Sequence, residues 1–128
     1  MSELPAILII EDDHEIQAIV EEALTDGGFE AAIARSGEEA VALLKSDGVK
    51  YRALVTDINL PGKLDGWEIA RVAREIDPTF PIVYMTGAAA DDWPSMGVPN
   101  SILLNKPFAP AQLVTAVSQL LNTGSPQA

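Results

Sequence analysis

The 128-residue sequence has no cysteine, few basic residues and no apolar run longer than a strand. Without cysteine, disulfides, thiol redox chemistry and thiolate metal sites are excluded. Eight lysines and arginines against 19 aspartates and glutamates give a formal net charge of −11. This balance argues against nucleic-acid partners, because binding to a phosphate backbone requires clustered cations. We see neither a membrane span nor a signal peptide, and we predict a cytoplasmic protein without membrane partners.

The hydrophobic share of the sequence is 48%, which is enough for one core, and the length is that of a single domain. We find no repeats, linkers or low-complexity tracts, and therefore place no internal domain boundary. An acidic chain of this kind suits the binding of cations or of basic faces on partner proteins.

Strand-like apolar runs alternate with segments of helical periodicity. We expect strands at residues 7–10, 29–34, 53–56, 81–85 and 101–105. Spacings of three and four residues predict buried helix faces at Ile16, Ile19, Val20, Ala23 and Leu24, at Ile69, Val72, Ala73 and Ile76, and at Leu113, Ala116, Val117 and Leu120. The repeated alternation predicts an α/β fold, a doubly wound five-stranded parallel sheet in the flavodoxin-like order 2-1-3-4-5.

Capping residues mark where several of these helices begin. Asp13 is placed to cap the first helix, Ser36 with Glu39 reads as a capping box for the second, and Asp65 with Glu68 as one for the third. The fourth helix is the exception, because the segment that should hold it contains Pro94, Gly97 and Pro99. At most two helical turns fit there, within residues 89–96.

Charged and polar residues stand where the predicted strands end. Glu11 and Asp12 follow the first strand and Asp57 the third, whereas Thr86 ends the fourth and Lys106 follows the fifth. The expected strand order has its switch point between the first and third strands, where ligands bind at the carboxyl ends. Crowded carboxylates raise one another's pKa unless a cation neutralises them. A hard divalent ion with oxygen ligands, such as Mg²⁺, is the natural partner.

These elements, in this order, resemble the receiver domain of bacterial two-component response regulators over essentially the whole chain. The resemblance rests on the strand-end residues above, and on the segments Leu60-Pro61-Gly62, Asp65-Gly66 and Lys106-Pro107-Phe108. It implies the flavodoxin-like fold and a phosphorylation switch that is not itself a true enzyme. In the family, the bond that corresponds to Lys106-Pro107 is usually cis.

The resemblance also implies a role for each site residue. Asp57 would accept the phosphoryl group as a 4-aspartylphosphate. Glu11, Asp12 and Asp57, with the backbone carbonyl of Asn59, would hold Mg²⁺. Thr86 would hydrogen-bond the phosphoryl group, and Lys106 would pair with Asp57 before modification and with the phosphate afterwards.

Two departures from the family pattern bear on how the signal leaves the site. The fifth strand usually carries an aromatic residue three positions before the lysine, and here that residue is Leu103. The fourth helix, part of the usual output face, is short and interrupted by proline. We therefore hypothesise that residues 88–100 themselves become ordered or shift on phosphorylation.

The sequence predicts a receiver domain over residues 1–122 and a flexible tail over 123–128. We expect a stand-alone regulator, a monomer or weak dimer. A histidine kinase or phosphotransfer protein would be its donor, and its output would be protein–protein contact or a phosphorelay. One alternative is a receiver excised from a hybrid kinase or longer regulator.

Other classes of protein fit the sequence less well. A haloacid dehalogenase-type phosphatase needs a second aspartate where this chain has Asn59. A nucleotide-binding or flavodoxin-like module needs a glycine-rich phosphate loop, and here three acids follow the first strand. A pseudo-receiver that only binds partners would be expected to lack some of the pocket residues, all of which this chain keeps.

Overall fold

The structure is a computed structural model that describes residues 4–47 and 50–123. Its strands are β1 (Ala6–Ile10), β2 (Glu30–Ala34), β3 (Tyr51–Asp57), β4 (Ile82–Thr86) and β5 (Ile102–Asn105). Its helices are α1 (His14–Asp26), α2 (Gly37–Asp47), α3 (Gly66–Ile76), the 3₁₀ turn η2 (Ala90–Asp92), α4 (Trp93–Met96) and α5 (Pro110–Thr123).

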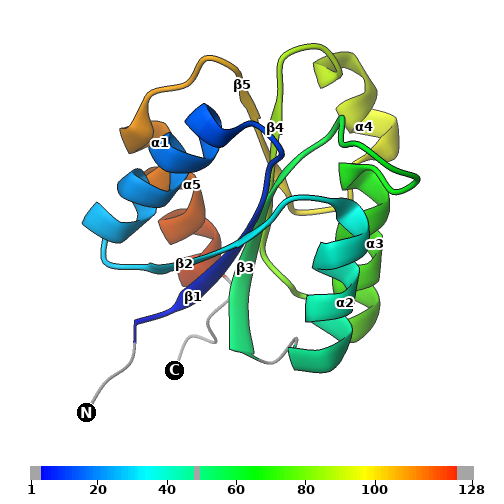
Figure 1. The fold of residues 1–128 in the computed structure, drawn as a ribbon, viewed down its shortest axis with the longest axis horizontal. Helices are drawn as coiled ribbons and strands as arrows, with labels where there is room; N and C mark the ends of the chain where they lie inside the picture. The colour runs from blue at the N-terminus through cyan, green and yellow to red at the C-terminus, as the bar shows by residue number, and fades with distance from the viewer. Residues whose placement is uncertain (1–3, 48–49, 124–128) are drawn as a thin grey trace.

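All five strands pair in parallel, in the order β2-β1-β3-β4-β5, which confirms the predicted topology. Helices α1 and α5 cover one face of the sheet, and α2 and α3 cover the other (Figure 1). The register pairs Ile10 of β1 with Thr56 of β3. The residues that follow these two therefore emerge side by side at the carboxyl edge of the sheet, which is the switch point of this strand order.

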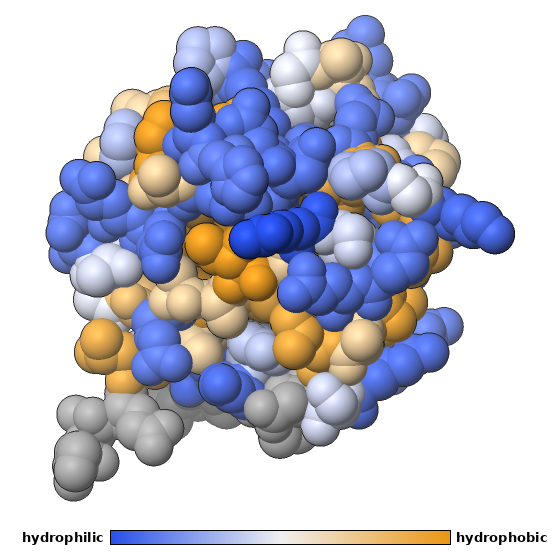
Figure 2. All heavy atoms as spheres, viewed as in Figure 1, coloured by the Kyte–Doolittle hydropathy of each residue, from blue (hydrophilic) through white to orange (hydrophobic). Residues whose placement is uncertain are grey.

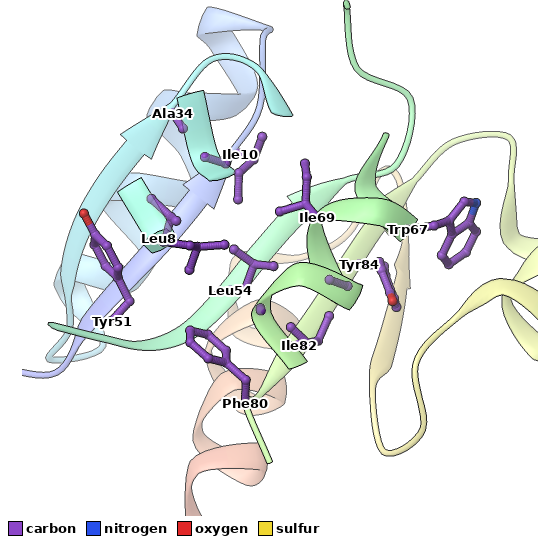
Figure 3. Packing of buried hydrophobic residues seen from close by; sticks show 14 of the residues in the cluster. Leu8, Ile10, Ala34, Tyr51, Leu54, Trp67, Ile69, Phe80, Ile82 and Tyr84 are labelled. Carbon is purple, nitrogen blue, oxygen red and sulfur yellow. The ribbon is translucent and has the colours of Figure 1, made fainter. Parts of the chain in front are cut away.

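The central strands are buried on both faces and divide the core in two. On β1, Leu8 and Ile10 pack toward α2 and α3 (Figure 3), whereas Ile7 and Ile9 pack toward α1 and α5. Burying one such side chain contributes about 1.5–3 kcal/mol, so these strands anchor the residues at their ends. Seen from the edge strand β2, hydrophobic atoms lie between the two helix layers, and the surface around them is largely hydrophilic (Figure 2).

The predicted caps are present, with one difference. Asp13 accepts hydrogen bonds from the backbone of Glu15 and Ile16, and Asp65 and Glu68 form a complete capping box. At α2, the Ser36 hydroxyl accepts from Glu39 N, but the Glu39 carboxylate accepts from Arg35 N, one residue before the expected partner.

Two isoleucines that the periodicity placed in the buried faces are exposed. Ile19 on α1 is 50% exposed and Ile76 at the end of α3 is 42% exposed. Ile19 lies at the side of a face centred on Val20 and Leu24, where the polar Gln17 is buried instead. Ile76 lies in the last turn of its helix. Spacing predicts the direction of an apolar stripe, but the outline of the neighbouring layer decides which of its edges is covered.

The fourth helix is short, as predicted, and consists of η2 and the single turn α4. We refer to residues 87–101, which include both, as the η2–α4 segment. Side chains from outside the segment hold its backbone. Tyr84 Oη accepts from Val98 N at 3.1 Å, Arg71 donates to Met96 O at 3.3 Å, and Arg74 donates to Pro99 O at 2.7 Å.

A second set of contacts lies inside the η2–α4 segment. Trp93 Nε1 donates to Ser101 Oγ at 3.0 Å, and Ser101 Oγ donates to Val98 O at 2.7 Å. A Cβ on Gly97 would lie 2.3 Å from the Trp93 ring. Glycine is therefore required for Trp93 to fold back over this turn.

Helix α5 ends at Thr123, the first residue of the predicted tail, and residues 124–128 lie outside the described part of the chain. The proposed division of the chain into residues 1–122 and 123–128 thus stays a prediction. None of the helices within the described ranges is long and apolar enough to cross a membrane.

Candidate functional site

Three carboxylates meet at the carboxyl edge of the sheet. Glu11 follows β1 directly and Asp57 is the last residue of β3. With Asp12 they form the acidic cluster, in which one carboxylate oxygen from each residue lies within 4.8 Å of the other two. Glu11 and Asp57 are buried and Asp12 is exposed. The three carboxylates that the sequence predicted to converge here do so.

Lys106 supplies the positive charge beside this cluster. Its Nζ lies 3.0 Å from Glu11 Oε1 and 3.3 Å from Asp57 Oδ2. The prediction paired Lys106 with Asp57, and the structure adds Glu11 as a second partner. The lysine side chain is 21% exposed, whereas that of Glu11 is 1% exposed. The Lys106-Pro107 peptide bond that follows is cis.

Burial governs the protonation of these groups. It raises the pKa of Glu11 and of Asp57, and the Lys106 ammonium offsets only part of that effect. Burial would lower the pKa of Lys106, but its hydrogen bond to Glu11 and the charge of Asp57 outweigh burial and raise it. The acidic cluster and one ammonium together carry a formal charge of −2. Without a further cation, the folded protein therefore favours proton uptake at this site.

The backbone of Glu11 is held on both sides. Its N–H donates to Ala34 O of β2 at 3.1 Å, and its carbonyl oxygen accepts from Gln17 Nε2 of α1 at 2.6 Å. Its carboxylate also accepts from Asp13 N at 3.1 Å. The sequence-based prediction missed Gln17. The available signal was its position three residues before Val20 and seven before Leu24, on the buried face of α1.

Thr86 ends β4, next to β3, and is fully buried. Its Oγ1 accepts from Ala88 N at 3.1 Å and from Ala89 N at 2.7 Å, and its backbone oxygen accepts from Lys106 N at 2.8 Å. A hydroxyl has two acceptor lone pairs and one proton. Both lone pairs serve the start of the η2–α4 segment, and the proton remains for a third partner.

The loop that follows Asp57 returns to the end of β3 where α3 begins. Gly66 N donates to Ile58 O at 2.9 Å, and a Cβ on Gly66 would lie 2.4 Å from Asp57 O. Only glycine permits this approach. The Asp65-Gly66 pair thus sets the backbone next to Asp57, while Asn59 is exposed two residues beyond it.

The residues present fit a divalent cation. Carboxylate oxygens are the ligands that Mg²⁺ prefers, and one divalent ion would balance the formal charge of −2. The same Asp57 carboxylate is a nucleophile of the kind that forms acyl phosphates. Leu103, which stands where the family pattern usually has an aromatic residue, is partly buried and packs against the core that contains Tyr84.

A five-stranded doubly wound sheet with an acidic cluster and a lysine at its switch point defines a class of signalling domain. The chain matches the family model of the response regulator receiver domain over residues 7–118. It therefore belongs to the receiver domain family of two-component response regulators.

Individual relatives agree with this assignment. The response regulator receiver protein CpdR of Brucella abortus (strain 2308) is 34% identical over 117 residues, which cover 90% of this chain and 95% of CpdR. The transcriptional regulatory protein PrrA of Mycobacterium leprae (strain TN) is 33% identical over 119 residues, which cover 91% of this chain and 50% of PrrA. The chain thus spans about half of that longer relative.

Among solved structures, a crystal structure of a response regulator receiver protein from Sinorhizobium medicae has a TM-score of 0.93 and 50% sequence identity to this chain. The alignment covers 96% of this chain and 98% of that one.

Proposed function

We propose that this receiver domain is a Mg²⁺-dependent phosphoacceptor in which Asp57 takes a phosphoryl group from a phosphohistidine. The observation that carries the proposal is the meeting of three carboxylates within 4.8 Å, with Lys106 Nζ 3.3 Å from Asp57. Glu11, Asp12, Asp57 and the backbone carbonyl of Asn59 would hold the ion. When bound, Mg²⁺ supplies charge neutralisation for the phosphoryl oxygens.

In the transfer, a carboxylate oxygen of Asp57 forms a bond to phosphorus as the phosphorus–nitrogen bond of the donor histidine breaks. The imidazole leaves with the bonding electron pair and takes its proton from water. Asp57 needs no general base, because it reacts as the carboxylate. Phosphoryl transfer of this kind depends mainly on positioning and on neutralising charge. The product is a mixed anhydride, the 4-aspartylphosphate.

Lys106 and Thr86 respond to the negative charge of the phosphoryl group on Asp57. A phosphoryl group adds about two negative charges, and the Lys106 ammonium is already within reach of Asp57. The Thr86 hydroxyl keeps a proton to donate, while its lone pairs hold the backbone of Ala88 and Ala89. A movement of this hydroxyl therefore also moves the backbone at the start of the η2–α4 segment.

The donor in this proposal is a histidine kinase or a phosphotransfer protein, and the output is protein–protein contact or onward transfer in a relay. The η2–α4 segment is the element that shifts, since Leu103 offers no aromatic ring to move with Thr86. The domain resets by slow hydrolysis of its own aspartylphosphate, and we therefore describe it as a switch. A cytoplasmic location, and a monomer or weak dimer, stay predictions.

One alternative concerns the length of the whole protein. Several relatives are longer than this chain, which leaves open a receiver taken from a hybrid kinase or larger regulator. The chemistry at Asp57 is the same in either case, so the full gene sequence decides between them. The phosphatase alternative gains no support, because Asn59 cannot serve as a general acid.

Incubation with a small phosphodonor and Mg²⁺ tests the proposal. We expect a mass increase of one phosphoryl group that maps to the peptide containing Asp57, and no increase in the presence of a chelator. Modification at another residue, or equal modification without a divalent cation, would contradict the proposal. Turnover of a phosphomonoester substrate would instead favour the phosphatase.

A further inference from the structure

The buried amide of Gln17 contacts the backbone of the acidic cluster, and the phosphoacceptor chemistry gives it no role. Gln17 is 7% exposed, and its Nε2 donates to the backbone oxygen of Glu11 at 2.6 Å. Together with the bond from Glu11 N to Ala34 O, this contact ties the residue after β1 to both β2 and α1. A buried polar side chain with one short, specific backbone contact restricts that backbone.

We propose that Gln17 is a positioning residue for the divalent cation, an inference that rests on the proposed function. The carbonyl oxygen that Gln17 binds belongs to the peptide plane that joins Glu11 to Asp12. Because a peptide unit is rigid, holding this oxygen fixes the direction in which the chain leaves Glu11 and therefore the position of Asp12. One hydrogen bond from α1 thus restricts the backbone that carries two of the three acids of the cluster, Glu11 and Asp12.

The chemistry of the amide suits this position. Glutamine donates a hydrogen bond without adding charge, so the cluster keeps its formal charge for the ion. A lysine here would place a second cation beside the carboxylates, and an ionised glutamate would turn an acceptor toward the Glu11 carbonyl oxygen. Residues that orient metal ligands in this way commonly change metal affinity by about 10–100-fold when they are replaced.

The test is calorimetric titration of the full chain with Mg²⁺ alone, together with thermal unfolding of the metal-free protein. Gln17→Leu keeps the size of the side chain and its fit to a helix, but removes the donor. We expect its Mg²⁺ dissociation constant to rise about tenfold. Unchanged Mg²⁺ affinity with lower stability would mean that Gln17 serves the fold only, and would overturn the inference.

Ser36→Ala is the control, because it also removes a side-chain hydrogen bond near the start of a helix, the one that Ser36 Oγ accepts from Glu39 N at α2. We expect this variant to lose stability and to bind Mg²⁺ as the wild type does. If Ser36→Ala weakens binding as much as Gln17→Leu, any loss of a helix-start contact has the same effect, and Gln17 has no specific role.

Gln17→Glu separates positioning from simple attraction. It adds a negative charge next to the cluster, so attraction alone predicts tighter Mg²⁺ binding, whereas loss of the donor predicts weaker binding. Tighter Mg²⁺ binding by Gln17→Glu would overturn the inference. The proposed function fails separately, because wild-type protein that takes up no Mg²⁺ would refute the metal site itself, whatever the variants do.

Discussion

The acidic cluster and the start of the η2–α4 segment lie on the same edge of the sheet, but the cluster and the segment are held in different ways. Glu11 and Asp57 stand at the ends of central strands whose backbones are paired on both sides. The η2–α4 segment contains two short helical pieces and depends on side chains such as Arg74 and Tyr84 to hold its loops. Strand pairing therefore positions the carboxylates of the acidic cluster. Individual side-chain hydrogen bonds, each removable by one substitution, hold the η2–α4 segment, which we propose responds to phosphorylation.

Thr86 belongs to both regions. Its backbone continues β4 and accepts from Lys106 N, and its hydroxyl holds the first amides of the η2–α4 segment. We expect a ligand that draws this hydroxyl toward Asp57 to affect the segment and to leave the paired strands unchanged. The difference between the two regions thus predicts that charge at the site changes the segment far more than it changes the sheet.

The largest effect should follow from Asp57→Asn. This variant removes the nucleophile from the acidic cluster but keeps the shape of the side chain, so we expect no aspartylphosphate and an intact fold, as checked by mass spectrometry and circular dichroism. Asp91→Asn, in the exposed part of the η2–α4 segment, is the control and should be phosphorylated normally. Phosphorylation of Asp57→Asn at wild-type yield would refute the assignment.

Lys106→Ala should separate phosphorylation at the acidic cluster from output through the η2–α4 segment. Removing one partner of a buried ion pair is costly, but this lysine is partly exposed, so we expect the metal-free protein to lose about 2 kcal/mol of unfolding free energy. The variant should still accept phosphate and should signal poorly to a partner. Normal partner binding by the phosphorylated variant in a pull-down would argue against a role for Lys106 in output.

Asp57→Asn should also stabilise the metal-free protein at neutral pH, because burial raises the pKa of Asp57 above its ordinary value of 3.8. The folded protein therefore takes up this proton at a higher pH than the unfolded chain, and ionised Asp57 destabilises the fold above its folded pKa. We expect Tm to rise by about 4 °C, equivalent to about 1 kcal/mol.

The gain in Tm should shrink as the pH falls through the raised folded pKa of Asp57 and vanish below its ordinary value. Thermal unfolding of both proteins across this pH range measures the difference. A gain that stays constant with pH would show that the charge of Asp57 is not its cause.

Tyr84→Phe tests the attachment of the η2–α4 segment. The variant keeps the ring that packs on Trp67 with a centroid distance of 4.7 Å and removes the bond from Val98 N. We expect a loss of about 1 kcal/mol and faster amide exchange at Val98, with exchange in β1 and β3 unchanged. Tyr51→Phe, at the amino end of β3, is the control and should leave Val98 unaffected.

The smallest effect concerns the switch itself. Amide hydrogen exchange with and without a phosphoryl mimic should differ across residues 88–100 and remain the same in the central strands. We expect the change to be largest at Ala88 and Ala89, whose amides bind Thr86 Oγ1. Identical protection in the two states would count against the hypothesis that this segment responds.

Much of this architecture was accessible from the sequence because it depends on local patterns. Apolar runs that end at Glu11 and Asp57 indicated buried strands with charges at their ends, and the strand order followed from the alternation with helices. Asp13 and Asp65 marked helix starts through chemistry contained within a few residues. Pro94 and Gly97 indicated the short fourth helix for the same reason.

The errors and omissions arose where separate elements pack against one another. The exposure of Ile19 depends on the outline of the neighbouring layer, which periodicity does not describe. The second partner of Lys106 depends on a contact across 95 positions. Gln17 looked like an ordinary polar helix residue, and only the folded chain places its amide against Glu11 O.

The sequence by itself determined the order of the elements, the five-stranded sheet and the set of residues at its carboxyl edge, because strand and helix periodicities and strand-end charges are local properties. Only the tertiary structure decided how Lys106 is shared between two carboxylates, that an amide of α1 holds the turn after β1, and how side chains hold the η2–α4 segment. Those features depend on how the elements pack against one another, which local sequence patterns do not describe even where, as for Gln17 and Glu11, the two residues are only six positions apart.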